Sequence, residues 1–139
     1  MLKNLPLPPS INNLYATYKG HRIKSVEGKV FDKKIQYYKL KHMLLLEEIS
    51  LFLKDKCIKV DRYFVFHKSR VFCKNGDIKK LDVTNYVKSL DDGLSLLLGI
   101  DDRYFKSGVC ELMWCEHKTN EQVIVDLNKF MVKEYRGII

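Results

Sequence analysis

The spacing of apolar residues in the first half of the chain limits the possible folds more than any other feature. Between residues 28 and 54, apolar side chains recur at alternating steps of four and three and make one stripe, formed by Phe31, Ile35, Tyr38, His42, Leu45, Ile49 and Phe52. This spacing predicts one long helix with a single buried face. Ser25 is its expected N-cap, and Glu27 suits the positive end of the helix dipole. Because His42 lies on the stripe, we interpret it as a core or edge histidine and not as a metal ligand.

The spacing then changes to the period of a strand. Residues 57–67 alternate between apolar and polar side chains, with Ile58, Val60, Phe64 and Phe66 on one face. Residues 84–98 predict a second helix, whose apolar side carries Tyr86, Leu90, Leu94 and either Leu97 or Leu98. Between this strand and the second helix, residues 70–73 are expected to end or continue a hairpin, and Asn75 and Gly76 predict a turn. Residues 108–117 and 121–127 are expected to form two closing strands that a polar turn connects.

This order of elements predicts an α+β fold in one small domain over residues 1–139. We expect a mixed or antiparallel sheet with the two main helices packed on one face. A chain of 139 residues is long enough to bury one core. Near the start, Pro6, Pro8 and Pro9 favour an extended segment at the edge of the structure.

The chain carries a formal charge of +8, which favours a polyanionic partner. Nucleic acid is the first such partner and an anionic membrane surface the second, although a basic surface without any partner is as plausible on charge alone. Residues 16–29 combine lysines, an arginine and two glycines, so we expect an exposed, mobile basic loop that can contact phosphates.

The cysteines and the apolar runs argue for an intracellular protein without a membrane anchor. The four cysteines form no CxxC pair, and Cys115 and His117 alone do not make a metal site. We expect reduced, buried thiols in strands; the full set is Cys57, Cys73, Cys110 and Cys115. No apolar run is long enough to cross a membrane, and prolines interrupt the N-terminal segment before a signal peptide can form. The expected location is therefore the cytoplasm.

Residues 79–102 concentrate carboxylates in an otherwise cationic chain. The helical spacing places Asn85, Lys88 and Asp92 on one face of the second helix, and a turn at Gly99 can bring Asp101 and Asp102 back toward them. Each acid alone has a simple explanation: Asp82 caps the helix, Asp91 and Asp92 are solvated, and the last pair forms a turn. Together, several carboxylates beside a lysine suit Mg²⁺-assisted phosphoryl chemistry.

These residues resemble a known family over most of the chain. The segment LPLPPSINNLY near the start, SVEG before the first helix, DVTNYVKSLDDGL and the following GIDD are similar to the RusA-type Holliday junction resolvases of bacteria and phages. One position departs from the family pattern, because Thr84 stands where the family has an acid directly before the asparagine.

The resemblance implies a homodimeric, structure-selective endonuclease that resolves four-way DNA junctions in recombination and repair. It implies Asp82, Lys88 and Asp102 as catalytic residues, with Mg²⁺ or Mn²⁺ held by Asp82, Asp92, Asp101 and Asp102. The residues expected to contact DNA are Lys19, Arg22, Lys24, Lys79, Lys80, Asn85 and Lys88. One alternative is a junction-binding protein that lost catalysis through Thr84. A second is an RNA-binding module, which the absence of an RNP-like strand or a GXXG loop disfavours.

Overall fold

The computed structural model describes residues 1–130 of the chain. Its larger sheet is five-stranded, mixed, and has the order β1-β7-β4-β5, with β6 also pairing with β4. β4 runs antiparallel to β7 and parallel to β5 and β6. The strands are β1 (Leu2–Leu5), β4 (Cys57–His67), β5 (Phe105–Ser107), β6 (Cys110–Cys115) and β7 (Gln122–Phe130).

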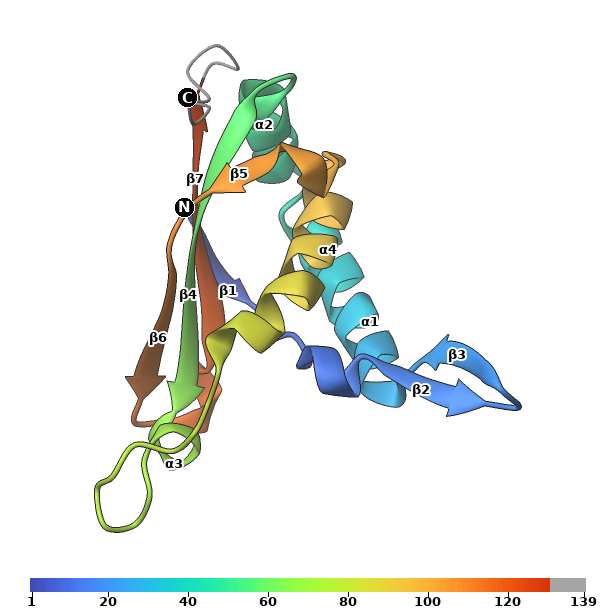
Figure 1. The fold of residues 1–139 in the computed structure, drawn as a ribbon. Coiled ribbons are helices and arrows are strands. Elements are labelled where there is room, and N and C mark those ends of the chain that lie inside the picture. Colours follow the sequence, from blue (N-terminus) through green and yellow to red (C-terminus); the bar gives the residue numbers. More distant parts are fainter. Residues whose placement is uncertain (131–139) are drawn as a thin grey trace, which may run out of the picture.

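The long helices cover one face of this sheet (Figure 1). They are α1 (Val26–Lys41), α2 (Met43–Leu53) and α4 (Val87–Leu98). Shorter elements connect them: η1 (Ile11–Asn13), the hairpin strands β2 (Tyr15–Tyr18) and β3 (His21–Lys24), α3 (Lys68–Val71), η2 (Val83–Tyr86), η3 (Asp102–Tyr104) and η4 (Lys118–Asn120). The predicted α+β class, with a mixed sheet and helices on one face, is confirmed.

β4 is the central strand and follows the predicted alternation. Ile58, Val60, Phe64 and Phe66 are completely buried beneath the helices. The apolar side of α4 packs on the same core, as predicted, through Leu90, Leu94, Leu97 and Leu98. Gly93 permits a close approach of α4 to α1, because a Cβ at this position would lie 3.1 Å from Ile35 Cδ1 and 3.2 Å from Phe31 Cζ.

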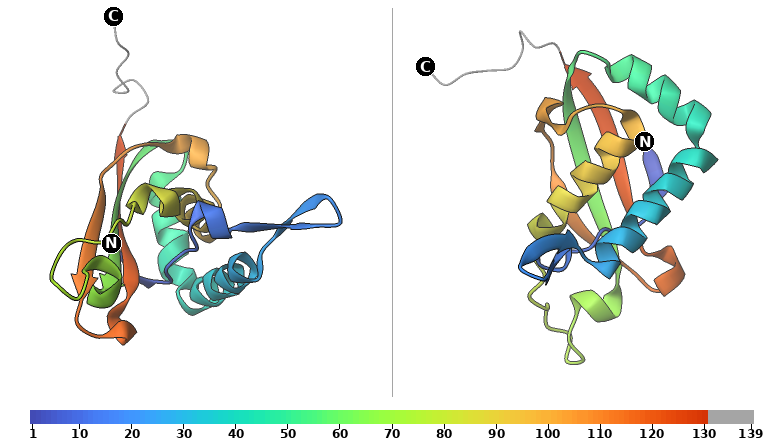
Figure 2. Two further views of the ribbon diagram at one scale, coloured as in Figure 1. Left: turned by 60° about the horizontal axis from the view of Figure 1, so that its bottom comes forward. Right: turned by 90° about the vertical axis from the view of Figure 1, so that its right-hand side faces the viewer.

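The prediction of one continuous helix over residues 28–54 is wrong, because the helix ends at Lys41 and restarts at Met43. His42 has φ −119° and ψ 27°, so it turns the chain between α1 and α2, and the two helices meet at an angle (Figure 2). This turn moves the buried face by one residue, from the predicted Leu45 and Phe52 to Leu46 and Leu53. The ring of His42 lies 4.3 Å from that of Tyr38, which agrees with an edge histidine.

The start of α1 follows its sequence signals. The Ser25 side chain caps the helix by accepting a hydrogen bond from the Gly28 backbone N–H, and Glu27 lies in the first turn. The second helix differs slightly from its prediction, since residues 83–86 form a 3₁₀ turn before α4 begins at Val87.

One further expectation is corrected by the structure. Residues 16–29 are not a loop: they hold most of β2, all of β3 and the start of α1, and the tip of the hairpin uses the left-handed residues Lys19 and Gly20. The two closing strands are confirmed as β6 and β7, and they flank β4 on opposite sides. The extended segment at the N-terminus is confirmed, with β1 at the edge of the sheet and the prolines directly after it.

The cysteines are free thiols, but only Cys57 is buried. Cys110 and Cys115 are half-buried in β6, whereas Cys73 is exposed in the segment after α3, where a strand was expected. In residues 1–130, no helix is long and apolar enough to cross a bilayer.

Candidate functional site

Lys88 brings two of the predicted acids together at the start of α4. Its Nζ lies 2.8 Å from Asp92 Oδ1 on the next turn and 3.9 Å from Asp102 Oδ2. Asp102 reaches this position because Gly99, with φ 63°, ends α4 and reverses the chain. The three side chains line an open groove together with Ser95, Leu96, Gly99, Ile100 and Asp101.

The surrounding carboxylates keep Lys88 charged. The hydrogen bond to Asp92 is the largest cause of a raised Lys88 pKa, with further contributions from the charges of Asp92 and Asp102 and from Tyr15, against a smaller opposing effect of burial. Lys88 is therefore an ammonium at every physiological pH. The influence of Tyr15 also places the base of the β2–β3 hairpin close to this lysine.

Behind this groove lies an ion pair that sequence reasoning missed. Arg62 on β4 donates two hydrogen bonds of 2.9 Å to the two carboxylate oxygens of Asp91, and both side chains are largely buried. Burial raises the pKa of Asp91, and Arg62 opposes that rise, while the negative charges of Asp102 and Asp92 add to it. Asp91 thus links the core to the exposed acids and is not the solvated residue that the sequence suggested.

A sequence signal for this pair exists in the alternation of β4. Arg62 occupies an inward position between Val60 and Phe64. A guanidinium in that register needs an acidic partner from the layer above the sheet. The acid-rich second helix was the available source of that partner.

Asp82 acts first as a helix cap, as its simple explanation predicted. Its Oδ1 accepts hydrogen bonds from the Thr84 backbone N–H at 3.0 Å and from Thr84 Oγ1 at 2.6 Å. These bonds, the side-chain one foremost, lower the pKa of Asp82. Thr84 lies inside η2, and its hydroxyl and backbone N–H both donate to the capping residue.

The remaining site candidates lie around this centre with different partners. Asp101 caps η3 and accepts a hydrogen bond of 2.8 Å from the Arg103 backbone N–H, which is the main reason for its lowered pKa. Asn85 is half-buried in η2, one residue beyond Thr84. The structure therefore brings Asp92 and Asp102 to the lysine, and Asp101 lines the same groove, whereas Asp82 and Asn85 are not among its lining residues.

The predicted metal set is only partly gathered. Within residues 1–130, no three His, Cys, Asp or Glu side chains converge on one point that could hold a metal ion. Asp92 and Asp102 nevertheless contact the same ammonium group, and both of their charges raise the pKa of nearby Asp91. Mg²⁺ commonly uses one or two carboxylates and completes its shell with water and substrate phosphates. The donor chemistry therefore fits a divalent cation at Asp92 and Asp102.

A basic and aromatic hairpin projects from the body of the protein beside the start of α1 (Figures 1 and 2). None of the side chains of β2 and β3 is buried. The Arg22 guanidinium lies 4.0 Å from the centre of the Tyr15 ring, and Lys19 Nζ lies 5.4 Å from that of Tyr18. The hairpin thus presents paired cations and aromatic rings to solvent.

Other predicted DNA contacts are partly occupied by bonds within the chain. Lys24 forms an ion pair of 2.8 Å with Asp32, so it fixes the hairpin to α1. Lys79 donates a hydrogen bond of 2.7 Å to the Ser69 carbonyl oxygen, and Lys80 is exposed in the following segment. Lys19, Arg22 and Lys80 are consequently better placed to meet an external phosphate than Lys24 or Lys79.

No protein-family model matches this chain, and no curated protein matches it either.

Proposed function

We propose that this protein is a structure-selective, Mg²⁺-dependent endonuclease that cuts four-way DNA junctions, as the RusA-type enzymes that it resembles do. One observation carries the proposal: Lys88 lies between Asp92 and Asp102 in an open groove, although these acids are separated by the whole second half of α4. A lysine held by two carboxylates at an accessible surface is suited to a phosphate group that arrives with a divalent cation.

The chemistry assigned to this groove is hydrolysis of a phosphodiester. Water forms a new bond to phosphorus while the bond to the leaving sugar oxygen breaks. Mg²⁺, when bound, supplies an activated water and neutralises phosphate charge. Asp92 and Asp102 would hold the cation, and Lys88, released from part of its carboxylate contact, would stabilise the negative charge that develops on the phosphate oxygens. Mn²⁺ has the same ligand preferences and is an alternative cation.

The hairpin and the overall charge support DNA as the substrate. A charge of +8 draws in a polyanion, and Arg22 and Lys19 are exposed on the β2–β3 hairpin, whose base residue Tyr15 contributes to the raised pKa of Lys88. A two-stranded ribbon has dimensions that fit the major groove of B-DNA. Tyr15 and Tyr18 add aromatic surfaces for bases that are unstacked at a branch point.

A homodimer completes the proposal, because a two-fold protein presents two active sites to a junction with two-fold symmetry. α2 and its surroundings offer an apolar surface for such a contact. Leu40 at the end of α1 and Leu44 and Leu51 on α2 are 72%, 79% and 75% exposed, respectively, and such exposed apolar side chains are typical of contact surfaces when they lie together.

A second candidate is a junction-binding protein that does not cut. Thr84 favours this candidate for two reasons. It stands where the family has an acid, and its hydroxyl donates a hydrogen bond to Asp82 Oδ1, which is then less available to a metal ion. Such a protein would keep the hairpin and Lys88 as phosphate contacts but would have too few free carboxylates to hold the cation.

A cleavage assay distinguishes the two functions. A synthetic mobile junction and a linear duplex of the same sequence are incubated with protein in Mg²⁺ or Mn²⁺. We expect paired nicks in the junction only, and their loss with Asp102→Asn while junction binding persists. Asp55→Asn is the matched control, because Asp55 is exposed in the turn after α2 and has the left-handed φ of 59° that asparagine tolerates. Binding without any cleavage by the wild type would favour the second candidate.

A further inference from the structure

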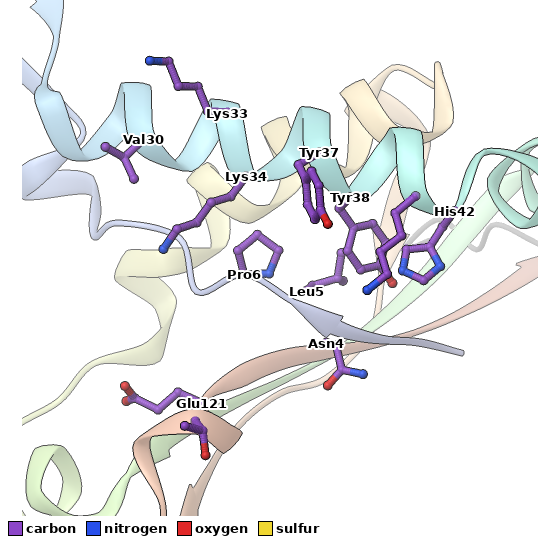
Figure 3. Close-up of a pocket in the computed structure, with 12 residues that line it drawn as sticks. Asn4, Leu5, Pro6, Val30, Lys33, Lys34, Tyr37, Tyr38, His42 and Glu121 are labelled. Atoms are coloured by element: carbon purple, nitrogen blue, oxygen red, sulfur yellow. The ribbon is translucent and has the colours of Figure 1, made fainter.

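A second groove lies between α1 and the edge strand β1 and shares no lining residue with the groove of Lys88. Its volume is about 580 Å³, within the range of ligand-binding cavities. Figure 3 shows α1 above the groove and β1 below it. The lining residues are Asn4, Leu5, Pro6, Val30, Lys33, Lys34, Tyr37, Tyr38, Lys41, His42, Thr119 and Glu121.

The groove is cationic. Lys33, Lys34 and Lys41 lie on its wall, and none of them forms an ion pair within residues 1–130. Lys34 points down toward Pro6, whereas Lys33 points away from the floor (Figure 3). The opposing acid, Glu121, already accepts a hydrogen bond of 2.8 Å from the His67 backbone N–H and lies 3.5 Å from Arg70 Nη1. Lys34 therefore faces the groove opposite a carboxylate that is largely neutralised, and Lys33 and Lys41 add two further positive charges to the groove wall.

An aromatic surface stands beside these lysines. Tyr37 is 67% exposed, although it lies in the middle of α1. Next to it, Tyr38 is held in place by donating a hydrogen bond of 2.7 Å to the Lys3 carbonyl oxygen and by contact with the His42 ring. The free Tyr37 ring thus lies next to a rigid wall, an arrangement that suits a flat group stacking on it.

The backbone of β1 disfavours an added peptide strand as the occupant. Asn4 has a left-handed φ of 59°, the register with β7 shifts between Leu2 and Leu5, and Pro6 follows without an N–H group. An edge that is bulged and ends in proline is a poor template for β-addition. Lysines with an exposed aromatic ring instead match the recognition of single-stranded nucleic acid, in which phosphates meet cations and bases stack on rings.

We propose that this groove binds a single strand of nucleic acid, with phosphates at Lys34 and Lys41 and a base against Tyr37. The inference rests on the proposed function to the extent that the protein must encounter DNA, but it does not require that the acids at Lys88 cut it. The groove would hold a strand that is unpaired near the branch, apart from the scissile phosphate.

Fluorescence anisotropy with a labelled single-stranded oligothymidylate tests the proposal. We expect Tyr37→Ala and Lys34→Glu each to weaken binding by about tenfold, the loss of one stacking or phosphate contact. Lys54→Glu is the matched control for charge, because Lys54 is exposed at the end of α2, and it should bind like the wild type within about twofold when salt is near physiological concentration. Thermal denaturation checks that each variant is folded.

Three outcomes overturn the inference. Equal losses with Lys34→Glu and Lys54→Glu would indicate unspecific attraction by net charge. An unchanged affinity in Tyr37→Ala, together with displacement of the oligonucleotide by polyglutamate, would indicate an acidic polypeptide site. Absence of binding by the wild type would remove the site altogether. Junction cleavage by the same variants separates the two proposals. A protein that cuts junctions but does not bind the single strand would support the proposed function and contradict the groove proposal. A protein that binds the strand but does not cut would support the groove proposal and contradict the proposed function.

Discussion

At the scale of single residues, the buried pair of Arg62 and Asp91 determines both stability and the charge of the site. Removing one partner leaves the other charge buried without compensation, which typically costs about 3–5 kcal/mol. We therefore expect Asp91→Ala to lower the free energy of unfolding by roughly that amount. Arg62→Leu in the same chain should recover most of it, because two apolar side chains can replace a buried pair. Urea unfolding of the single and double variants measures both effects.

The pH dependence of Asp91 has a definite sign. Its pKa is raised in the folded state, chiefly by burial, so the folded protein binds a proton at pH values where the unfolded chain has lost it. The contribution of this group to stability is therefore largest at acid pH and declines as pH rises from the ordinary carboxyl value through the raised one. Asp91→Asn should not show this decline, so the stability of the wild type minus that of the variant should fall as pH rises through this window. Identical slopes in that window would contradict the assignment.

Thr84 decides how well the site holds a cation. Thr84→Asp adds a carboxylate and removes the hydroxyl hydrogen bond to Asp82 Oδ1. The new carboxylate and this oxygen of Asp82 then become available as metal ligands. We expect Thr84→Asp to need less Mg²⁺ for half-maximal junction cleavage than the wild type, which should work better in Mn²⁺. Thr84→Asn is the control of similar size without charge. Superimposable Mg²⁺ titrations for all three proteins would place Thr84 outside the metal site.

At the scale of elements, the hairpin β2–β3 is specialised for contact, because none of its side chains is buried. Tyr18→Ala should leave thermal stability unchanged but weaken junction binding by about tenfold, within the range of one lost stacking contact. Met113→Ala, which truncates a 44% exposed side chain on β6, is the control. Gel-shift titrations compare the two. Equal affinity of Tyr18→Ala and Met113→Ala for the junction would show that the hairpin does not contact DNA.

Elements with strong local patterns could be predicted from the sequence, and elements fixed by tertiary contacts could not. β4 and the apolar side of α4 follow their periodicities, and Ser25 caps α1 as expected. The turn at His42 carries no glycine or proline, so nothing local indicated that the helix would end there. The hairpin turns at Lys19 and Gly20, a pair with a weaker turn signal than Asn-Gly. In the site, helical spacing was enough to place Lys88 and Asp92 on one face. The partner of Asp91 could not be predicted in this way, because it depends on which strand lies beneath α4.

At the scale of the whole molecule, the exposed leucines on and beside α2 form the surface that we propose a second copy covers. In the proposed homodimer, this surface is the contact between two copies. Leu44→Glu should then convert the dimer into a monomer, because a charge replaces a side chain that is 79% exposed in the single chain. Ile78→Glu, at a 74% exposed position far along the chain, is the control. Analytical ultracentrifugation measures the mass. A wild type that is already monomeric would contradict this interface.

The central claim is that Lys88 and Asp102 act as one catalytic unit on a phosphodiester. Single-turnover cleavage of a four-way junction at saturating Mg²⁺ tests it with the wild type, Lys88→Ala, Asp102→Asn and the double variant. We expect each single change to slow cleavage by about 10²–10³-fold. The double variant should be little slower than the worse single one, because residues that act as a unit lose their effect together. Wild-type rates in either single variant, or losses that multiply in the double one, would contradict the account.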